Sequence, residues 1–270
     1  MCALALAVGT VAVAASPAGA AVTIGQVGNA AGSACDAGID LTEPTVPVGN
    51  PYVAPGVGTI TSWAMNATGP AGQQLTMKMY RKVADPSTYQ VVGHAGPQTL
   101  TPGSLNTFPA SVRVQPGDVL GFRTVTNNSK CAFQLVGTTL LLTNQDLADG
   151  GSAAFDPINE DASLNIQATF VPDNAFTGKP KVKRNKKNGT ATVTVNLPNP
   201  GTLSASGGGA KISKAKTVLA GASKLKVKAK GLKKRQLSQN GKVGLSLSVI
   251  YTPTGGDPHQ QKIKLKLLKN

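Results

Sequence analysis

The sequence predicts an all-β protein in which a jelly-roll-like β-sandwich is followed by a smaller immunoglobulin-like (Ig-like) β-sandwich. Three observations predict this class. Short apolar runs with a period of two recur along the chain, glycine (31 residues) and proline (18 residues) are plentiful, and long runs with a helical period are missing. Hydrophobic residues make up 40% of the chain, but aromatic residues only 4%. Short strands joined by many turns are typical of this composition.

Residues 1–21, MCALALAVGTVAVAASPAGAA, are predicted to be an export signal peptide. Their apolar run ends at Ser16-Pro17 and is followed by Ala18-Gly19-Ala20, the small-x-small pattern that signal peptidase requires. The run is not preceded by a basic residue, since the first one in the chain is Lys78. The alternative is a buried N-terminal strand or helix. A membrane anchor is not expected, because the run is shorter than the roughly 18–20 residues of a spanning helix.

The cysteines predict one disulfide bond. Cys2 lies in the predicted signal peptide, which leaves Cys35 and Cys131 as a pair in an exported protein. A bond between them would stabilise the first domain by about 4–5 kcal/mol at most in the chain-entropy model. Two free thiols are the alternative. A zinc site is not expected, because no histidine lies near either cysteine in the sequence.

Charge divides the chain into two parts. Residues 1–177 contain six basic and eleven acidic residues, a net charge of −5, whereas residues 178–270 contain twenty-one basic residues and one acidic residue, a net charge of +20. A change of this size indicates a domain boundary. We therefore expect a β-sandwich domain over residues 22–171, a linker over residues 172–179 and a basic Ig-like domain over residues 180–270.

The first domain is predicted to contain eight strands separated by turn signals such as Asp85-Pro86 and Pro116-Gly117-Asp118. Leu75, Met77 and Met79 alternate with polar residues and therefore share one face of their strand. Strands at this spacing, without helical patterns between them, predict a sandwich of the jelly-roll kind. The expected strands are residues 59–65, 75–82, 89–94, 111–115, 119–125, 131–136, 138–143 and 164–171.

The second domain is predicted to contain seven strands, the number found in an Ig-like sandwich. It has no cysteine and no tryptophan, so it lacks the disulfide and core Trp of antibody domains. One short helical turn is expected over residues 232–240, ended by Gly241. The expected strands are residues 181–184, 191–197, 201–206, 211–219, 224–230, 243–252 and 262–268.

The run from Gly178 to Val195, GKPKVKRNKKNGTATVTV, resembles the lysine-rich Ig-like modules that end many secreted proteins of high-GC bacteria. The first domain, with Thr59-Ile-Thr-Ser-Trp63 and Pro116-Gly-Asp-Val-Leu-Gly121, is similar to the β-sandwich that often precedes such a module. This resemblance covers most of the chain after the signal peptide, and it implies a compartment and a fold but no ligand. An Asp-rich calcium-binding repeat often follows the first domain in such relatives. Only Val171-Pro172-Asp173-Asn174 stands there in this chain, so calcium is not expected.

Two runs of alternating lysines are the predicted binding residues of the second domain. In a strand, alternate side chains share a face and lie about 6.6–6.8 Å apart, so each run forms a straight row of ammonium groups. Such a row suits a polyanion: nucleic acid, an acidic glycan or a phosphodiester wall polymer such as teichoic acid. Binding would gain from counterion release and would weaken with salt. The two rows are Lys224, Lys226, Lys228 and Lys230, and Lys262, Lys264 and Lys266.

An alternative for both rows is that lysines on a solvent face only prevent aggregation and maintain solubility. The domain has one aromatic residue, Tyr251, whereas single-strand recognition normally uses aromatic stacking platforms. We therefore expect no sequence-specific nucleic-acid binding, and non-specific adhesion to an anionic cell-wall polymer or acidic glycan is the favoured form of the hypothesis.

Aromatic residues of the first domain suggest a weaker, lectin-like alternative. Exposed aromatics in carbohydrate-binding modules stack on sugar rings, and Trp63 and Tyr80 are the residues predicted for this role. Met77 and Met79 face away from Tyr80, so Tyr80 is expected to be exposed beside Lys78. Otherwise these aromatics fill the sandwich core.

Catalytic and metal-binding signals are weak. The acidic clusters Asp146–Asp149 and Asp156–Asp161 do not match a spaced calcium loop, so no metal or other cofactor is expected. The sequence has two histidines, His94 and His259, and no nucleophile elbow, zinc-binding helix or phosphate-binding glycine loop. A triad built on His94 would need an unrecognised serine and acid. We therefore expect no enzyme.

Together these observations predict an exported, non-enzymatic protein of the cell envelope or extracellular matrix. Its basic domain would dock on an anionic surface polymer without a transmembrane anchor. A carbohydrate-binding first domain, a purely structural surface protein and a hydrolase are the alternatives.

Overall fold

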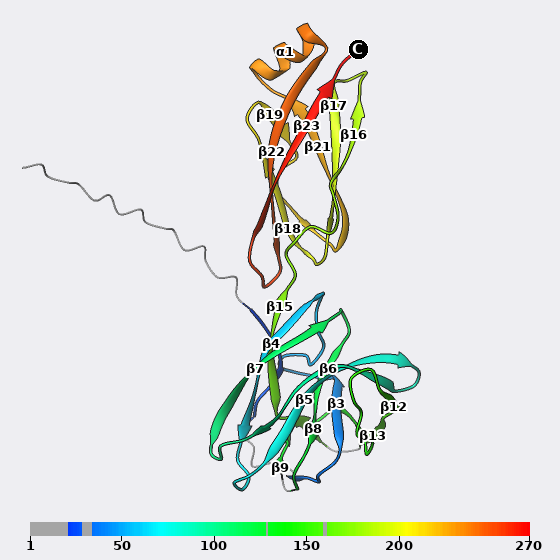
Figure 1. Cartoon of the computed structure of the whole chain (residues 1–270), viewed down its shortest axis with the longest axis vertical. Coiled ribbons are helices and arrows are strands. Elements are labelled where there is room, and N and C mark those ends of the chain that lie inside the picture. Colours follow the sequence, from blue (N-terminus) through cyan, green and yellow to red (C-terminus); the bar gives the residue numbers. More distant parts are fainter. Residues whose placement is uncertain (1–20, 29–33, 128, 159–160) are drawn as a thin grey trace, which may run out of the picture.

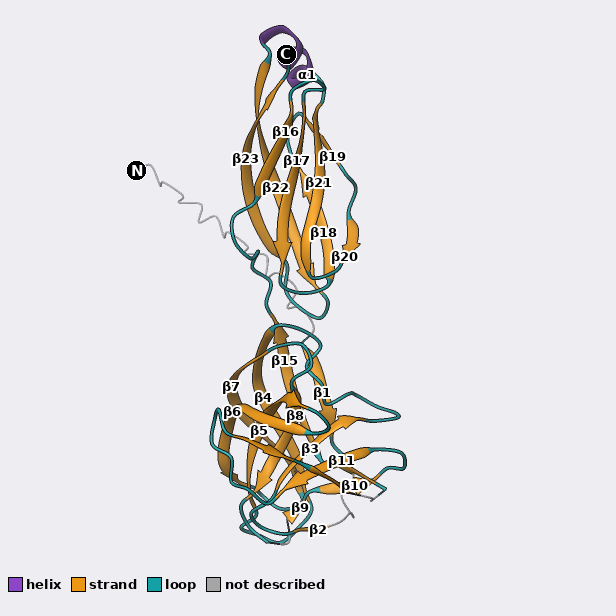
Figure 2. Ribbon diagram, turned by 90° about the vertical axis from the view of Figure 1, so that its right-hand side faces the viewer, coloured by secondary structure: helices purple, strands orange, loops and turns teal. Residues whose placement is uncertain are grey.

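The computed structural model describes residues 21–270 apart from 29–33, 128 and 159–160. Apart from Ala21, the predicted signal peptide lies outside the described residues. Two β-sandwiches lie end to end in the described part, as Figures 1 and 2 show. In that part, no helix is both long enough and apolar enough to cross a membrane.

The first sandwich has the strand order of a jelly roll, which confirms the predicted fold class. Its four-stranded sheet has the order β1-β15-β4-β7, and its larger sheet has the order β12-β6-β5-β8-β3-β11-β13, with antiparallel pairing throughout both. The eight main strands are β1 (Val22–Gln26), β3 (Asp40–Thr45), β4 (Gly58–Ala67), β5 (Gln74–Ala84), β6 (Thr88–Thr99), β7 (Ser104–Val114), β8 (Val119–Thr124) and β15 (Ile166–Pro172). Shorter strands are β2 (Ala34–Cys35), β9 (Ser129–Lys130), β10 (Ala132–Gln134), β11 (Thr139–Thr143), β12 (Ser152–Ala154), β13 (Asp156–Ile158) and β14 (Ala162–Leu164).

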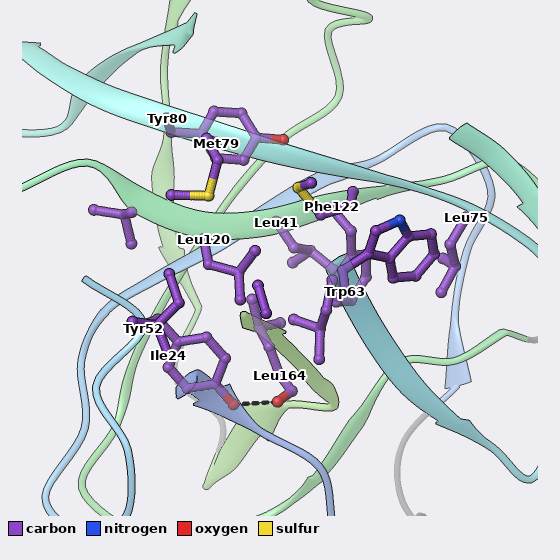
Figure 3. Packing of buried hydrophobic residues seen from close by; sticks show 14 of the residues in the cluster. Ile24, Leu41, Tyr52, Trp63, Leu75, Met79, Tyr80, Leu120, Phe122 and Leu164 are labelled. Carbon is purple, nitrogen blue, oxygen red and sulfur yellow. Dashed lines mark hydrogen bonds between the residues drawn. The ribbon is translucent and has the colours of Figure 1, made fainter. Parts of the chain in front are cut away.

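The core of this sandwich is formed by the inward faces of the two sheets. Met77 and Met79 of β5 are buried there, as their alternation predicts. Trp63 of β4 lies in the same core near Leu75 and Phe122 (Figure 3). Period-two patterning therefore predicted the inward face of β5 correctly.

The outer face of the seven-stranded sheet is also covered, and this overturns the prediction that Tyr80 is exposed. Tyr80 is 0% exposed because its ring packs on Phe155, with 5.3 Å between the ring centroids, and Phe155 in turn packs on Tyr89. Lys78, on the same face of β5, is only 4% exposed. Residues 147–155, which follow β11, lie over this face through Leu147 and Phe155, so the outward side of β5 does not meet solvent.

Two strands of the jelly roll, β1 and β3, were not among the predicted strands. The sequence of β3, DLTEPT, contains two acidic residues and a proline, yet Asp40 and Glu43 are both fully buried. A strand with buried carboxylates lacks the apolar alternation on which strand prediction depends. The predicted disulfide is present: Cys35 and Cys131 are bonded, with 5.9 Å between their Cα atoms.

The second sandwich has two four-stranded sheets, ordered β16-β17-β21-β19 and β20-β18-β22-β23, and this is the arrangement of an Ig-like domain with one additional edge strand. The predicted 211–219 strand is divided, because the chain pairs first with β21 and then crosses to pair with β18. The predicted helical turn is the helix α1 (Leu232–Asn240), which ends at Gly241 in a left-handed conformation. The strands are β16 (Lys181–Asn185), β17 (Thr190–Leu197), β18 (Gly201–Ser206), β19 (Ala210–Ile212), β20 (Lys216–Val218), β21 (Gly221–Ala229), β22 (Lys242–Pro253) and β23 (His259–Leu268).

Each sandwich has its own hydrophobic cluster, and Asn199 of the second sandwich contacts the first. The Asn199 side-chain oxygen accepts a 2.8 Å hydrogen bond from the Val57 amide, and its Nδ2 donates to the Val57 carbonyl at 2.8 Å and the Asp173 carbonyl at 2.9 Å. A bidentate ion pair between Arg113 and Asp173 lies beside this contact. The helix α1 lies at the opposite end of the second sandwich, away from the first (Figure 2).

Candidate polyanion-binding face

The lysines of both predicted rows are exposed, and the residues that alternate with them point inward. Lys224, Lys226 and Lys228 of β21 alternate with Leu225 and Val227, which are fully buried. Lys230 follows the end of this strand and is also exposed. On β23, Lys262, Lys264 and Lys266 are exposed between Ile263, Leu265 and Leu267, which are buried. Two rows of outward lysines above an apolar core are therefore present.

The two rows do not share a surface. β21 belongs to one sheet of the sandwich and β23 to the other. Because the inner faces of the two sheets pack together, their outer faces point in opposite directions. The chain consequently presents two separate rows, and their surroundings differ.

The β21 row belongs to a wider arrangement that the alternation of lysines along one strand does not predict. Outward threonines of β17 separate it from a second set of lysines on β16. The strand registers place Lys183 opposite Thr192 and Thr192 opposite Lys226, and likewise Lys181, Thr194 and Lys224 in line. We call each such line a rung. A third line contains Asn185, Thr190, Lys228 and Lys211 of β19.

We call these residues the lysine–threonine face. Its lysines are exposed, and its threonines are partly buried between them. The alternation Thr190-Ala-Thr-Val-Thr194 was the available sequence signal, but the pairing of β16, β17 and β21 is needed to place the threonines between the lysines. The face consists of Lys181, Lys183, Thr190, Thr192, Thr194, Lys211, Lys224, Lys226 and Lys228.

Two open hollows lie on and beside this face. The first, of about 720 Å³, is lined by residues of β16, β17 and β21, including Lys183, Thr192 and Lys226. The second, of about 660 Å³, shares Thr190 and Lys228 with the first and extends to α1. Its lining adds Lys211, Lys230, Lys234 and Lys269. The basic surface therefore continues from the sheet to the free end of the sandwich.

The electrostatics of the second sandwich are one-sided. After residue 177 the chain has twenty-one basic residues and a single acidic residue, Asp257. Asp257 lies in the turn between β22 and β23, where its carbonyl accepts a hydrogen bond from Asn174 near the junction of the sandwiches. One carboxylate cannot neutralise so many cations, so the lysines repel one another and a bound polyanion would relieve that repulsion.

The β23 row has different neighbours. Lys262, Lys264 and Lys266 lie opposite Ser248, Ser246 and Gly244 of β22, and no second column of lysines flanks them. β23 is an edge strand of its sheet. Lysines on an edge strand discourage pairing with another chain, so this row fits the solubility alternative better than the β21 row does.

The two aromatics predicted for carbohydrate binding cannot stack on a sugar. Trp63 is 1% exposed and Tyr80 is 0% exposed, so neither ring presents a face to solvent. Both are core residues, as the alternative interpretation held. The lectin-like prediction is wrong for these two residues because the covered outer face and the sandwich core remove them from the surface.

His94 and the first acidic cluster, Asp146–Asp149, lie in a polar cluster on the seven-stranded sheet. Lys78 pairs with buried Asp40 at 2.8 Å, and Arg123 pairs with Asp40 at 3.0 Å and with Asp146 at 3.2 Å. His94 Nδ1 lies 2.7 Å from Asp149 Oδ1. The adjacent hollow of about 300 Å³ is lined by Thr76 but by no serine or cysteine. The contacts of Asp146 with Arg123 and of Asp149 with His94 hold the segment after β11 against the sheet.

Part of the second acidic cluster, residues 159–160, lies outside the described residues. Among the residues that the structure does describe, no group of three or more His, Cys, Asp or Glu side chains is arranged to hold a metal ion.

Comparisons with known proteins give no family. No family model matches the chain, and no curated protein matches it. Two solved structures of a β-glucuronidase from Ruminococcus gnavus, in complex with uronic deoxynojirimycin and with N1-substituted uronic isofagomine, align with 12% identity and TM-scores of 0.23 and 0.22. The alignments cover 91% of this chain and 46% of the enzyme, so the chain spans less than half of its length. A likeness this weak carries no argument about function.

Proposed function

We propose that the protein is an exported, non-enzymatic component of the cell envelope or extracellular matrix whose basic domain docks on an anionic surface polymer. The observation that carries this proposal is the lysine–threonine face, where two columns of exposed lysines flank a column of hydroxyl groups. The net charge of +20 after residue 177 adds a long-range attraction for polyanions.

The binding mechanism would be electrostatic. A polyanion carries condensed counterions, and each lysine that neutralises one of its charges releases a counterion into solution. For single-stranded phosphodiesters the logarithm of the binding constant falls with the logarithm of salt concentration by roughly 0.7 for each neutralised phosphate. If each of the five lysines in the two columns neutralised its own phosphate, the slope would be roughly −3.5, the steepest that these columns allow.

A further observation supports an extracellular setting. The Cys35–Cys131 disulfide fits an oxidising compartment, since such bonds are rare in reducing ones. In this proposal, retention at a surface is electrostatic and non-covalent. The first sandwich, held to the second through Asn199, would face outward as a structural or binding module.

The proposal is tested by the retention of the full chain on purified cell walls across a salt series. We expect retention at low salt and release as the salt concentration rises. Walls from which the anionic polymer has been extracted serve as the control and are expected to retain little protein. Retention that does not change with salt concentration, or no retention at low salt, would overturn the proposal. Solubility would then remain as the role of the lysines.

A further inference from the structure

We infer that the lysine–threonine face binds one extended strand of a polyol phosphodiester, laid along β17 with one phosphate at each rung. This inference rests on the proposed function and specifies its ligand. The rungs Lys181–Thr194–Lys224 and Lys183–Thr192–Lys226 are equivalent in composition, so the face repeats one binding unit along the strand.

The repeat of the face matches the repeat of such a polymer. Successive rungs are two residues apart along the strand, which is about 6.6–6.8 Å. A glycerol phosphate polymer has six skeletal bonds from one phosphorus to the next. Three bonds of an extended polypeptide backbone span about 3.3–3.6 Å, so six bonds span about 6.6–7.2 Å. Each phosphate of an extended strand would thus meet a new rung.

The width of the face admits a single strand. β16 and β21 lie on either side of β17, so their lysine columns are about 9–10 Å apart at the backbone. Flexible lysine side chains from both columns can reach a phosphate between them. The threonine hydroxyl beneath can donate a hydrogen bond to a phosphate oxygen, which adds a directional contact to the charge.

Two other polyanions fit less well. A single-stranded nucleic acid has the same six-bond backbone repeat, but its binding normally gains from bases stacked on aromatic side chains. Tyr251, the one aromatic residue between 180 and 270, is buried in the core and absent from this face. An acidic polysaccharide has a charge repeat set by its sugar rings, which does not follow the two-residue repeat of a strand.

The test uses the full chain and a synthetic glycerol phosphate oligomer, with binding measured by calorimetry at several salt concentrations. The variant Lys183→Ser/Lys226→Ser removes one rung. The matched control, Lys262→Ser/Lys264→Ser, removes the same charge from the opposite sheet. A third variant, Thr192→Val, keeps the charge and the β-branched shape but removes a hydroxyl. Thermal unfolding of each variant verifies that these surface changes leave the fold intact.

We expect the rung variant to lose affinity at least tenfold and to reduce the salt slope by about 0.7, because the rung neutralises one phosphate. Thr192→Val should lose affinity severalfold without a change in the salt slope. The control Lys262→Ser/Lys264→Ser should keep the affinity and the salt slope of the native protein. Equal losses in the rung variant and the control would refute the inference while leaving the proposed function standing. Tighter binding of oligothymidylate or polyglucuronate than of the glycerol phosphate oligomer would also refute the inference and leave the proposed function standing. No binding of any of these polyanions would overturn both.

Discussion

Glu43 offers a direct test of how burial controls the stability of the first sandwich. This residue of β3 is fully buried, and its carboxylate accepts hydrogen bonds from Ser163 Oγ at 2.9 Å and from the Leu164 amide at 2.7 Å. In the described part of the chain no cation forms an ion pair with it. Nearby, the Tyr52 hydroxyl donates to the Leu164 carbonyl (Figure 3). Burial raises the pKa of Glu43 from 4.5 to about 7, although the hydrogen bonds from Leu164 and Ser163 lower it in part.

The sign and size of the effect on stability follow from this pKa. Between pH 4.5 and 7 the folded protein holds a proton on Glu43 that the unfolded chain has released, so the free energy of unfolding falls as the pH rises. Each pH unit in this window lowers the free energy of unfolding by about 1.4 kcal/mol. Above pH 7 the total loss reaches about 3 kcal/mol. Glu43→Gln has no charge to bury and should escape this loss.

The assay is urea unfolding of the full chain with its disulfide intact, followed by the fluorescence of Trp63. Trp63 is the only tryptophan of the chain and is buried in the first core, so it reports on this sandwich alone. Relative to the native protein, the stability of Glu43→Gln should rise by about 2.5 kcal/mol between pH 5 and pH 8. The control Asp156→Asn, at an exposed carboxylate, should show no such rise. A Glu43→Gln variant that tracks the native protein across this range would refute the reasoning.

Two further predictions concern the contacts that hold the chain together. Replacing both Cys35 and Cys131 with serine should lower the free energy of unfolding of the first sandwich by about 4–5 kcal/mol at most, because the bond closes a loop of 96 residues. Trp63 fluorescence in urea measures this, and an unchanged midpoint would contradict it. Asn199→Ala removes three hydrogen bonds to Val57 and Asp173, worth about 3 kcal/mol together. The distribution of distances between spin labels on exposed positions of the two sandwiches should become broader in this variant. The thermal midpoints of both cores should stay unchanged. A distance distribution as narrow as that of the native protein would show that Asn199 does not hold the junction.

Local chemistry predicted much of the fold. The alternation of Lys224, Lys226 and Lys228 with aliphatic residues indicated a strand with one solvent-exposed face and one buried face, and β21 has both. Gly241 indicated the end of α1, because glycine adopts the left-handed conformation at little cost. These features depend on neighbouring residues in the chain, so a single sequence contains the information.

Tertiary structure decided the rest. The pattern around Tyr80 correctly placed it opposite Met77 and Met79, but a distant segment covers that face and buries the ring. Likewise, the two lysine rows look alike in sequence, yet only the β21 row is flanked by threonines and a second lysine column.

The period of a strand determines which side chains share a face, and the sequence alone is enough to predict this. Whether that face meets solvent, a distant segment or a neighbouring strand depends on residues far away in the chain. For this protein, alternation alone determined which residues lie together, and long-range packing decided which of those faces can bind anything.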